Sequence, residues 1–186
     1  MLDTTRTGDA ERVEFSQEDA TRWSLRAIQR VNVPRGDVFH FFADAANLAR
    51  ITPPELGFHI LTPQPIAMCA GALIDYRMRL WGIAMSWRTE ITTWNPPIEF
   101  VDTQLRGPYA EWAHRHRFIA VTDGSTLVED YVQFQLPMGR LGTIASPIVR
   151  RQLRRIFDYR RCAIARLKVG NRESGIENPR EPIHIE

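Results

Sequence analysis

Two histidines stand out as residues suited to chemistry in this chain of 186 residues. His114 and His116 lie two positions apart in a β-like segment, on the same alternating positions as the aromatic residues Trp112 and Phe118. Successive side chains of a strand point to opposite faces, so the imidazoles and the aromatic rings share one face. The aromatic residues mark this face as the buried one. We therefore expect both imidazoles to point inward.

Asp130 is the one charged residue among the apolar positions of the next β-like segment. Two turns between the segments are possible. A turn at Thr122–Gly124 with a glycine bulge places His116 opposite Asp130. A plain two-residue turn at Asp123–Gly124 pairs Asp130 with Arg117 instead. We favour the first register because it buries the apolar faces of both strands together.

A buried pair of His116 and Asp130 would hold one imidazole tautomer, as a general acid or base requires. The plainer alternative is that the two side chains satisfy each other or orient a ligand, because unpaired buried polar groups are costly. A chelate of His114, His116 and Asp130 is a third possibility. No cysteine or third histidine lies nearby in the sequence, so we expect neither a metal site nor a cofactor.

Neighbouring segments supply further candidates for the wall of a binding cavity. Tyr76 alternates with Met78, and Trp87 alternates with Met85, each on one face of its strand. Tyrosine and tryptophan combine apolar bulk with one hydrogen-bonding group, whereas methionine adapts to irregular shapes. The residues expected to contact a ligand are Tyr76, Met78, Met85, Trp87, Trp112, His114, His116, Asp130, Phe134 and Ile156.

The elements that position these residues follow from apolar periodicity and turn signals. Residues 23–33 alternate as a first strand, and residues 35–51 fit two short helices that break near Asp44–Asn47. A long amphipathic helix follows from about 144 to 168. Between them lie six β-like segments, Phe58–Leu61, Leu73–Leu80, Ile83–Trp94, Phe100–Leu105, Tyr109–Val121 and Thr126–Leu136. This α+β order predicts a curved seven-stranded antiparallel sheet around the last helix, with a cavity between them.

The chain divides into one domain and two polar ends. Residues 1–22 are acidic and predict an N-terminal arm, residues 23–169 form the ligand-binding domain, and residues 170–186 predict a flexible tail. The two cysteines, Cys69 and Cys162, are far apart and suggest no disulfide framework. No signal-peptide pattern or membrane-spanning apolar run is visible, so we expect a cytoplasmic protein.

Positive charge is concentrated in the last helix. The whole chain has a formal net charge of +2, yet residues 144–168 contain eight basic residues against one acidic residue, Asp158. A solvated face explains such a run most simply. The alternatives are an anionic membrane surface, a protein partner or the chain's own acidic arm. No motif for reading nucleic acid accompanies the arginines, and specific nucleic-acid binding is not expected. The candidate contact residues are Arg150, Arg151, Arg154 and Arg155.

Three stretches carry a family resemblance: Val38–Leu61, Gly71–Phe118 and Arg150–Arg161. They resemble the helix-grip superfamily, also called START or SRPBCC, and within it the bacterial ligand-binding proteins of polyketide cyclase/dehydrase and coenzyme-Q-binding type. The resemblance implies a hydrophobic ligand in an internal cavity. It implies no fixed catalytic set, because this scaffold carries transporters, sensors and enzymes.

These observations lead to three hypotheses about function. The first is a non-enzymatic module that binds or transports a lipophilic molecule, such as a lipid, isoprenoid, polyketide or aromatic metabolite. The second is a cyclase or dehydratase that uses His116 and Asp130 as an acid–base pair, with Arg88 or Tyr76 as an oxyanion partner. The third is a protein that docks on a membrane or a partner through the arginines of the last helix.

Overall fold

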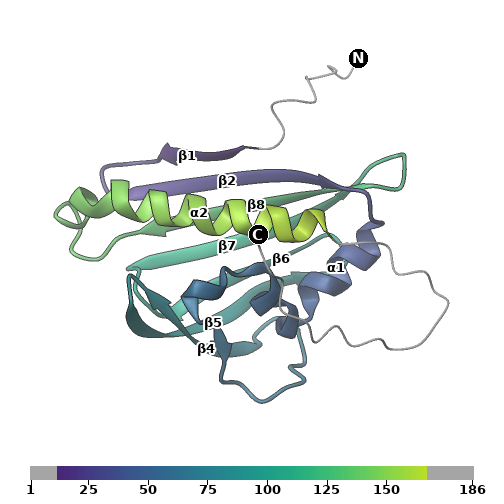
Figure 1. The fold of residues 1–186 in the computed structure, drawn as a ribbon, viewed down its shortest axis with the longest axis horizontal. Coiled ribbons are helices and arrows are strands. Elements are labelled where there is room, and N and C mark those ends of the chain that lie inside the picture. The colour runs from purple at the N-terminus through teal and green to yellow at the C-terminus, as the bar shows by residue number, and fades with distance from the viewer. Residues whose placement is uncertain (1–11, 167–186) are drawn as a thin grey trace.

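The computed structural model describes residues 12–166, which form one antiparallel sheet and a small set of helices. The sheet has eight strands in the order β1-β2-β8-β7-β6-β5-β4-β3. Their bounds are β1 Val13–Gln17, β2 Arg22–Val31, β3 His59–Ile60, β4 Leu73–Leu80, β5 Ile83–Asn95, β6 Glu99–Arg106, β7 Glu111–Ala120 and β8 Thr126–Gln135. The helix α2, Ser146–Ala165, lies along one face of the sheet (Figure 1).

Short helices connect β2 to β3 along the chain. They are α1 (Arg35–Ala43) and the 3-10 helices η1 (Ala45–Ile51) and η2 (Pro54–Leu56). A further 3-10 turn, η3 (Gly142–Ala145), leads into α2. The break between α1 and η1 falls at Asp44, whose carboxylate accepts a hydrogen bond from the backbone N–H of Ala46 at 2.9 Å. This side-chain cap satisfies a backbone donor that the new helix would leave unpaired.

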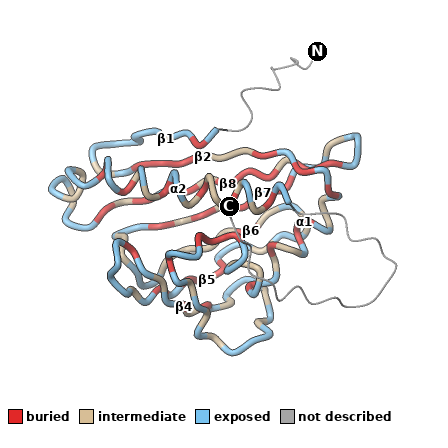
Figure 2. Tube along the Cα trace, viewed as in Figure 1, coloured by how far each residue is buried: buried red, intermediate tan, exposed pale blue. Residues whose placement is uncertain are grey.

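The core lies between α2 and the inner face of the sheet (Figure 2). The apolar stripe of α2 consists of Val149, Leu153, Phe157 and Ile164, all buried. It packs on alternating strand residues that recur at every second position, as the strand period requires. This helix-grip architecture confirms the predicted α+β class. Within residues 12–166, no helix is both long and apolar enough to span a membrane.

The sheet has one strand more than the sequence predicted. β1 lies in the segment that was expected to be part of a polar arm, and it pairs with β2, with Phe15 opposite Leu25. Val13 is buried, and Phe15 packs against the core. These two apolar residues alternate correctly for a strand, but five residues in an acidic context gave too short a signal. The rest of the predicted arm, 1–11, and the predicted tail, 170–186, lie outside the described residues.

Candidate functional site

An internal cavity of about 150 Å³ lies between the sheet, α2 and the η1–η2 segment. Aromatic and aliphatic side chains make up most of its wall. Phe42 comes from α1, Leu56 from η2, and Leu153 from α2. The strands add the aromatic residues Tyr76, Trp87 and Trp112. A cavity with mostly apolar walls is suited to a small organic molecule, and it lies at the place where the fold predicts one.

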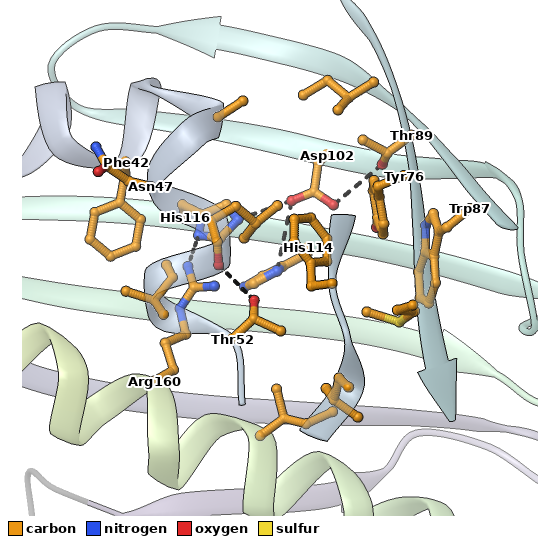
Figure 3. Close-up of a pocket in the computed structure, with 18 of the residues that line it drawn as sticks. Phe42, Asn47, Thr52, Tyr76, Trp87, Thr89, Asp102, His114, His116 and Arg160 are labelled. Atoms are coloured by element: carbon orange, nitrogen blue, oxygen red, sulfur yellow. Dashed lines mark hydrogen bonds and ion pairs between the residues drawn. The ribbon is translucent and has the colours of Figure 1, made fainter. Parts of the chain in front are cut away.

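Five ionisable side chains lie close together beside this cavity. We call them the polar cluster. Asp102 comes from β6, His114 and His116 from β7, Asp130 from β8, and Arg160 from α2. The three strands are neighbours in the sheet, and Asp102 is directly opposite His114, whereas His116 is opposite Asp130. Figure 3 shows Arg160 reaching from the helix toward the histidines. The fold thus brings four strand positions and one helix position to a single point.

Each imidazole of the polar cluster contacts a carboxylate. The distance between His116 Nε2 and Asp102 Oδ2 is 2.9 Å, and the distance between His114 Nε2 and Asp130 Oδ1 is also 2.9 Å. The two imidazole rings are 3.7 Å apart, centre to centre. Arg160 completes the network, with Nη2 3.1 Å from His116 Nδ1 and Nε 3.3 Å from Asp130 Oδ2. All members are mutually supported, as a buried polar group requires.

The contacts of the two imidazoles restrict where their protons can lie. His116 Nδ1 lies between Arg160 Nη2 at 3.1 Å, which only donates, and Asp130 Oδ1 at 2.9 Å, which only accepts, whereas His116 Nε2 lies 2.9 Å from Asp102 Oδ2. His114 Nε2–H donates to Asp130. The remaining nitrogen, His114 Nδ1, has no hydrogen-bond partner within residues 12–166 and lies 3.7 Å from Asp102 Oδ2. His114 thus has a free lone pair, whereas both nitrogens of His116 are occupied.

The surroundings set the charges of the polar cluster. Burial lowers the pKa of His114 to about 4, helped by the nearby His116 and opposed by Asp130, so this imidazole is neutral at pH 7. Burial alone would raise the pKa of Asp130, but the charge of Arg160 and the hydrogen bonds from both histidines hold it well below its usual value. For Asp102, burial also opposes the shift, yet the hydrogen bond from His116 lowers its pKa. Both carboxylates are therefore ionised at neutral pH.

Aromatic side chains form the wall of the cavity on the side of β4 and β5. The rings of Tyr76 and Trp87 are stacked 5.7 Å apart, and Trp112 meets Trp87 edge to face at 5.4 Å. Burial raises the pKa of Tyr76 well above its ordinary value, so its phenol stays protonated. The indole N–H of Trp87 is buried and has no hydrogen-bond partner in the part of the chain that the structure describes.

Most of the residues that the sequence singled out lie where they were expected. The favoured register is found, with a turn that ends at Gly124, where φ is +81° and glycine is the natural choice. The cavity wall includes seven of the expected contact residues, namely Tyr76, Met78, Trp87, Trp112, His114, His116 and Ile156. Asp130 lies behind the imidazoles and reaches the cavity through them.

Three of the residues that the sequence suggested for the site lie outside the cavity wall. Met85 pairs with Met78 near the β4–β5 turn but does not line the cavity. Phe134 is 1% exposed and packs on Tyr109 and Trp112 outside the cavity wall. Arg88 cannot serve as an oxyanion partner because it lies on the opposite face of β5, half exposed and paired with Asp75 at 2.8 Å.

The sequence reasoning missed Asp102 and Arg160. Asp102 alternates with the buried Phe100 on β6, which is the same signal that identified Asp130. Arg160 lies three residues after Phe157 and four before Ile164, within the apolar stripe of α2. It is only 7% exposed, and its guanidinium lies 5.0 Å from the ring of Phe42. The sequence analysis counted it only as one of the eight basic residues of the helix and assigned it to neither face.

The other arginines of α2 make contacts within the chain. Arg150 stacks on Trp23 at 4.3 Å, and Arg155 forms an ion pair with Glu55 at 2.6 Å. Arg154 donates to the backbone oxygen of Val13 at 3.0 Å and lies over the ring of Phe15. Of these contacts, those of Arg154 reach the N-terminal strand β1, through a backbone oxygen and an aromatic ring. A membrane or protein partner for Arg150, Arg151, Arg154 and Arg155 stays a prediction.

Comparison with known proteins supports the fold and leaves the subgroup open. No protein-family model matches the chain, and no curated protein matches its sequence. Among solved structures, Zhui aromatase/cyclase from a Streptomyces species superposes with a TM-score of 0.60 at 17% identity, over 77% of this chain and 92% of that one. A Mycobacterium smegmatis protein gives 0.58 at 16% identity, over 83% and 94%. Major latex-like protein 151 from Panax ginseng gives 0.58 at 10%, over 78% and 96%. The chain has a helix-grip, SRPBCC-like fold.

Proposed function

We propose that the protein binds a small lipophilic molecule in the cavity between the sheet and α2. The observation that carries this proposal is a largely apolar cavity of about 150 Å³ whose wall includes Trp87, with a buried N–H that has no hydrogen-bond partner within residues 12–166. An unsatisfied buried donor costs about 1 to 3 kcal/mol, which a ligand with an acceptor oxygen would recover. The aromatase/cyclase among the structural neighbours supports a ligand of this chemical type.

The size of the cavity narrows the class of ligand. A cavity of about 150 Å³ is comparable with engineered apolar cavities that hold one benzene molecule. A one-ring aromatic metabolite with a carbonyl or ether oxygen therefore fits as the cavity stands. A lipid, isoprenoid or multi-ring polyketide requires the η1–η2 segment, which supplies Leu48 and Leu56 to the wall, to move outward.

Two probes of equal shape test this proposal by calorimetry. Acetophenone carries a carbonyl acceptor, and ethylbenzene lacks it. The wild-type protein is expected to bind acetophenone more tightly, and Trp87→Phe is expected to weaken that binding roughly tenfold while changing ethylbenzene little. Trp94→Phe, which alters a tryptophan outside the cavity wall, is the matched control. Absence of binding of both probes to the wild-type protein would overturn the proposal.

A second candidate function is acid–base catalysis of a dehydration or cyclisation. The observation that favours it is the free lone pair of His114 Nδ1, because His114 also donates to Asp130 through its other nitrogen. This arrangement holds a base in one tautomer beside a cavity. The acid–base pair inferred from the sequence is His116 and Asp130. Both nitrogens of His116 already contact other side chains of the polar cluster, so His114 is the better candidate for the base.

The dehydration of 4-hydroxy-4-phenylbutan-2-one, followed by absorbance, tests this second function. His114 removes the proton next to the carbonyl and then gives it to the hydroxyl group, which leaves as water, so that the product is the conjugated ketone and the base is restored. His114→Gln is expected to abolish turnover while acetophenone still binds. The control is His59→Gln, at an exposed histidine on β3. If both variants turn over at the wild-type rate, His114 is not the base.

A further inference from the structure

Asp102, His114 and His116 bring three potential metal ligands to one point on the cavity wall. One ligand atom from each side chain lies within 4.8 Å of the other two. Asp102 Oδ2 is 2.9 Å from His116 Nε2 and 3.7 Å from His114 Nδ1. Around a tetrahedral ion with bonds of about 2.0 to 2.1 Å, ligand atoms are roughly 3.3 Å apart. The two observed separations lie on either side of that value.

The free lone pair of His114 gives a reason for a cation between these atoms. His114 Nδ1 lies 3.7 Å from Asp102 Oδ2, beyond hydrogen-bond distance, while its other nitrogen, Nε2, is hydrogen-bonded to Asp130. Two acceptors in a buried site repel each other unless a proton or a metal ion lies between them. The cluster also contains two carboxylates and only one guanidinium, that of Arg160. A divalent cation would compensate the excess negative charge.

Asp130 occupies the position of an outer carboxylate around such an ion. Its Oδ1 accepts from His114 Nε2 at 2.9 Å and also lies 2.9 Å from His116 Nδ1. In metal sites, a histidine ligand commonly donates its other N–H to a carboxylate, which fixes the ring and increases its basicity. One aspartate is placed to do this for both histidines, while its second oxygen, Oδ2, faces Arg160 at 3.3 Å.

The open side of the three ligands faces the cavity. Asp102, His114 and His116 all line it, whereas Asp130 does not. An ion held by these three side chains would therefore keep at least one coordination position directed at the cavity. The space of about 150 Å³ exceeds what one water molecule needs, so water or a ligand oxygen can occupy that position. Sites with three protein ligands and an open position are typical of reactive rather than structural metal centres.

We propose that Asp102, His114 and His116 bind a divalent first-row transition-metal ion, with Asp130 as the positioning residue for both imidazoles. Two imidazoles and one carboxylate suit ions such as Zn²⁺, Fe²⁺ or Co²⁺ rather than Mg²⁺ or Ca²⁺, which prefer oxygen ligands. This proposal departs from our expectation of no metal site, which rested on His114, His116 and Asp130. Asp102 takes the place of Asp130 as the third ligand.

Metal binding requires a particular tautomer of His116. Nε2 must be unprotonated to coordinate an ion, in place of its hydrogen bond with Asp102. In that tautomer the Nδ1–H donates to Asp130 Oδ1, which lies 2.9 Å away. Arg160 keeps its ion pair with Asp130 at 3.3 Å.

Titration with Co²⁺, followed by visible absorption and calorimetry, tests the site in the full-length protein. The chain is first treated with EDTA and dialysed, in a Cys69→Ser, Cys162→Ser background, because both thiols are exposed and bind metals themselves. We expect one Co²⁺ per chain, displacement by Zn²⁺ and no competition from Mg²⁺. Asp102→Asn is expected to weaken binding on the order of 100-fold, and Asp130→Asn between about 10- and 100-fold. His59→Gln, at an exposed histidine, is the control and is expected to bind normally.

A readout on the wild-type protein keeps the test decisive if a variant fails to fold. Bound Co²⁺ is paramagnetic and should broaden the indole N–H signal of Trp112, whose ring centre is 6.3 Å from that of His114. The signal of Trp81, exposed in the turn after β4, should stay sharp. Absence of saturable Co²⁺ and Zn²⁺ binding, or equal affinity in folded Asp102→Asn, would overturn the proposal. Acetophenone binding is measured separately, so the two proposals can fail independently.

Discussion

Asp102 and His116 lie on neighbouring strands and meet through a hydrogen bond of 2.9 Å between Oδ2 and Nε2. The imidazole also stacks on the ring of Phe100, with centres 4.3 Å apart. Both partners are shielded, with side-chain exposures of 18% for Asp102 and 5% for His116. This contact ties β6 to β7 on the inner face of the sheet. A substitution that removes this hydrogen bond is therefore expected both to destabilise the sheet and to disturb the candidate site.

Replacing Asp102 with Asn should destabilise the fold. The change keeps the shape but removes the charge that accepts from His116, and hydrogen bonds to charged groups contribute about 1.5 to 3 kcal/mol. Urea unfolding of the EDTA-treated protein measures the loss. Asp75→Asn breaks an exposed pair with Arg88 and is expected to cost less than about 1 kcal/mol. Equal losses for the two variants would contradict a buried role for Asp102.

Stability should fall between about pH 6.5 and pH 4 in the EDTA-treated protein. Burial lowers the pKa of His114 to about 4 from its ordinary value of 6.5. In that interval the unfolded chain binds a proton that the folded chain does not, so acid favours unfolding. The shift corresponds to roughly 3 kcal/mol in total. Thermal unfolding at a series of pH values measures it. His114→Gln should flatten the profile in this window, whereas His59→Gln should leave it unchanged.

Filling the cavity should abolish ligand binding without unfolding the protein. Ile74 on β4 is buried and lines the cavity, and Ile74→Phe places extra volume inside it. Overpacking costs typically about 1 to 3 kcal/mol in a filled core, and less where space is available. Calorimetry with acetophenone, together with urea unfolding, measures both effects. Ile83→Phe, at an exposed position on β5, is the control. Undiminished binding in Ile74→Phe would locate the ligand elsewhere.

Arg154 should hold β1 on the sheet. Its guanidinium donates to the backbone oxygen of Val13 and lies 5.3 Å from the ring centre of Phe15. Arg154→Ala removes both contacts and is expected to cost about 1 kcal/mol. Amide hydrogen exchange across Val13–Gln17 should accelerate, because β1 is an edge strand that pairs only with β2. Arg151→Ala alters an exposed arginine of the same helix and should leave exchange in β1 unchanged.

The sequence predicted the inner face of the sheet well because strand alternation is a local signal. It identified His114, His116 and Asp130 on buried positions and favoured the register that the structure shows. The same alternation places Asp102 beside Phe100, so this residue was within reach of the reasoning that identified Asp130. What the sequence could not provide is the pairing of β6 with β7 in a specific register, which depends on how the whole sheet closes.

Two errors arose from composition rather than from periodicity. Arg160 was counted only as one of the basic residues of α2, although its spacing places it among the buried residues of the helix. A charge is stable there only because Asp130 compensates it, and that partner comes from a distant strand. Val13–Gln17 was assigned to an arm because its surroundings are acidic. Pairing with β2 and the contacts of Arg154 stabilise this strand, and neither is visible locally.

The direct cross-strand pairing of Asp102 with His114, and of His116 with Asp130, also constrains how related sequences can vary. One residue inserted within β7 would turn both imidazoles to the outer face and dismantle the network. Insertions in the turn before β7 would leave it intact. A relative that keeps the site should therefore show a His-x-His pair with an inward aspartate on the strand before and another on the strand after, whatever its loop lengths. That pattern separates sequences that retain this chemistry from those that share only the architecture.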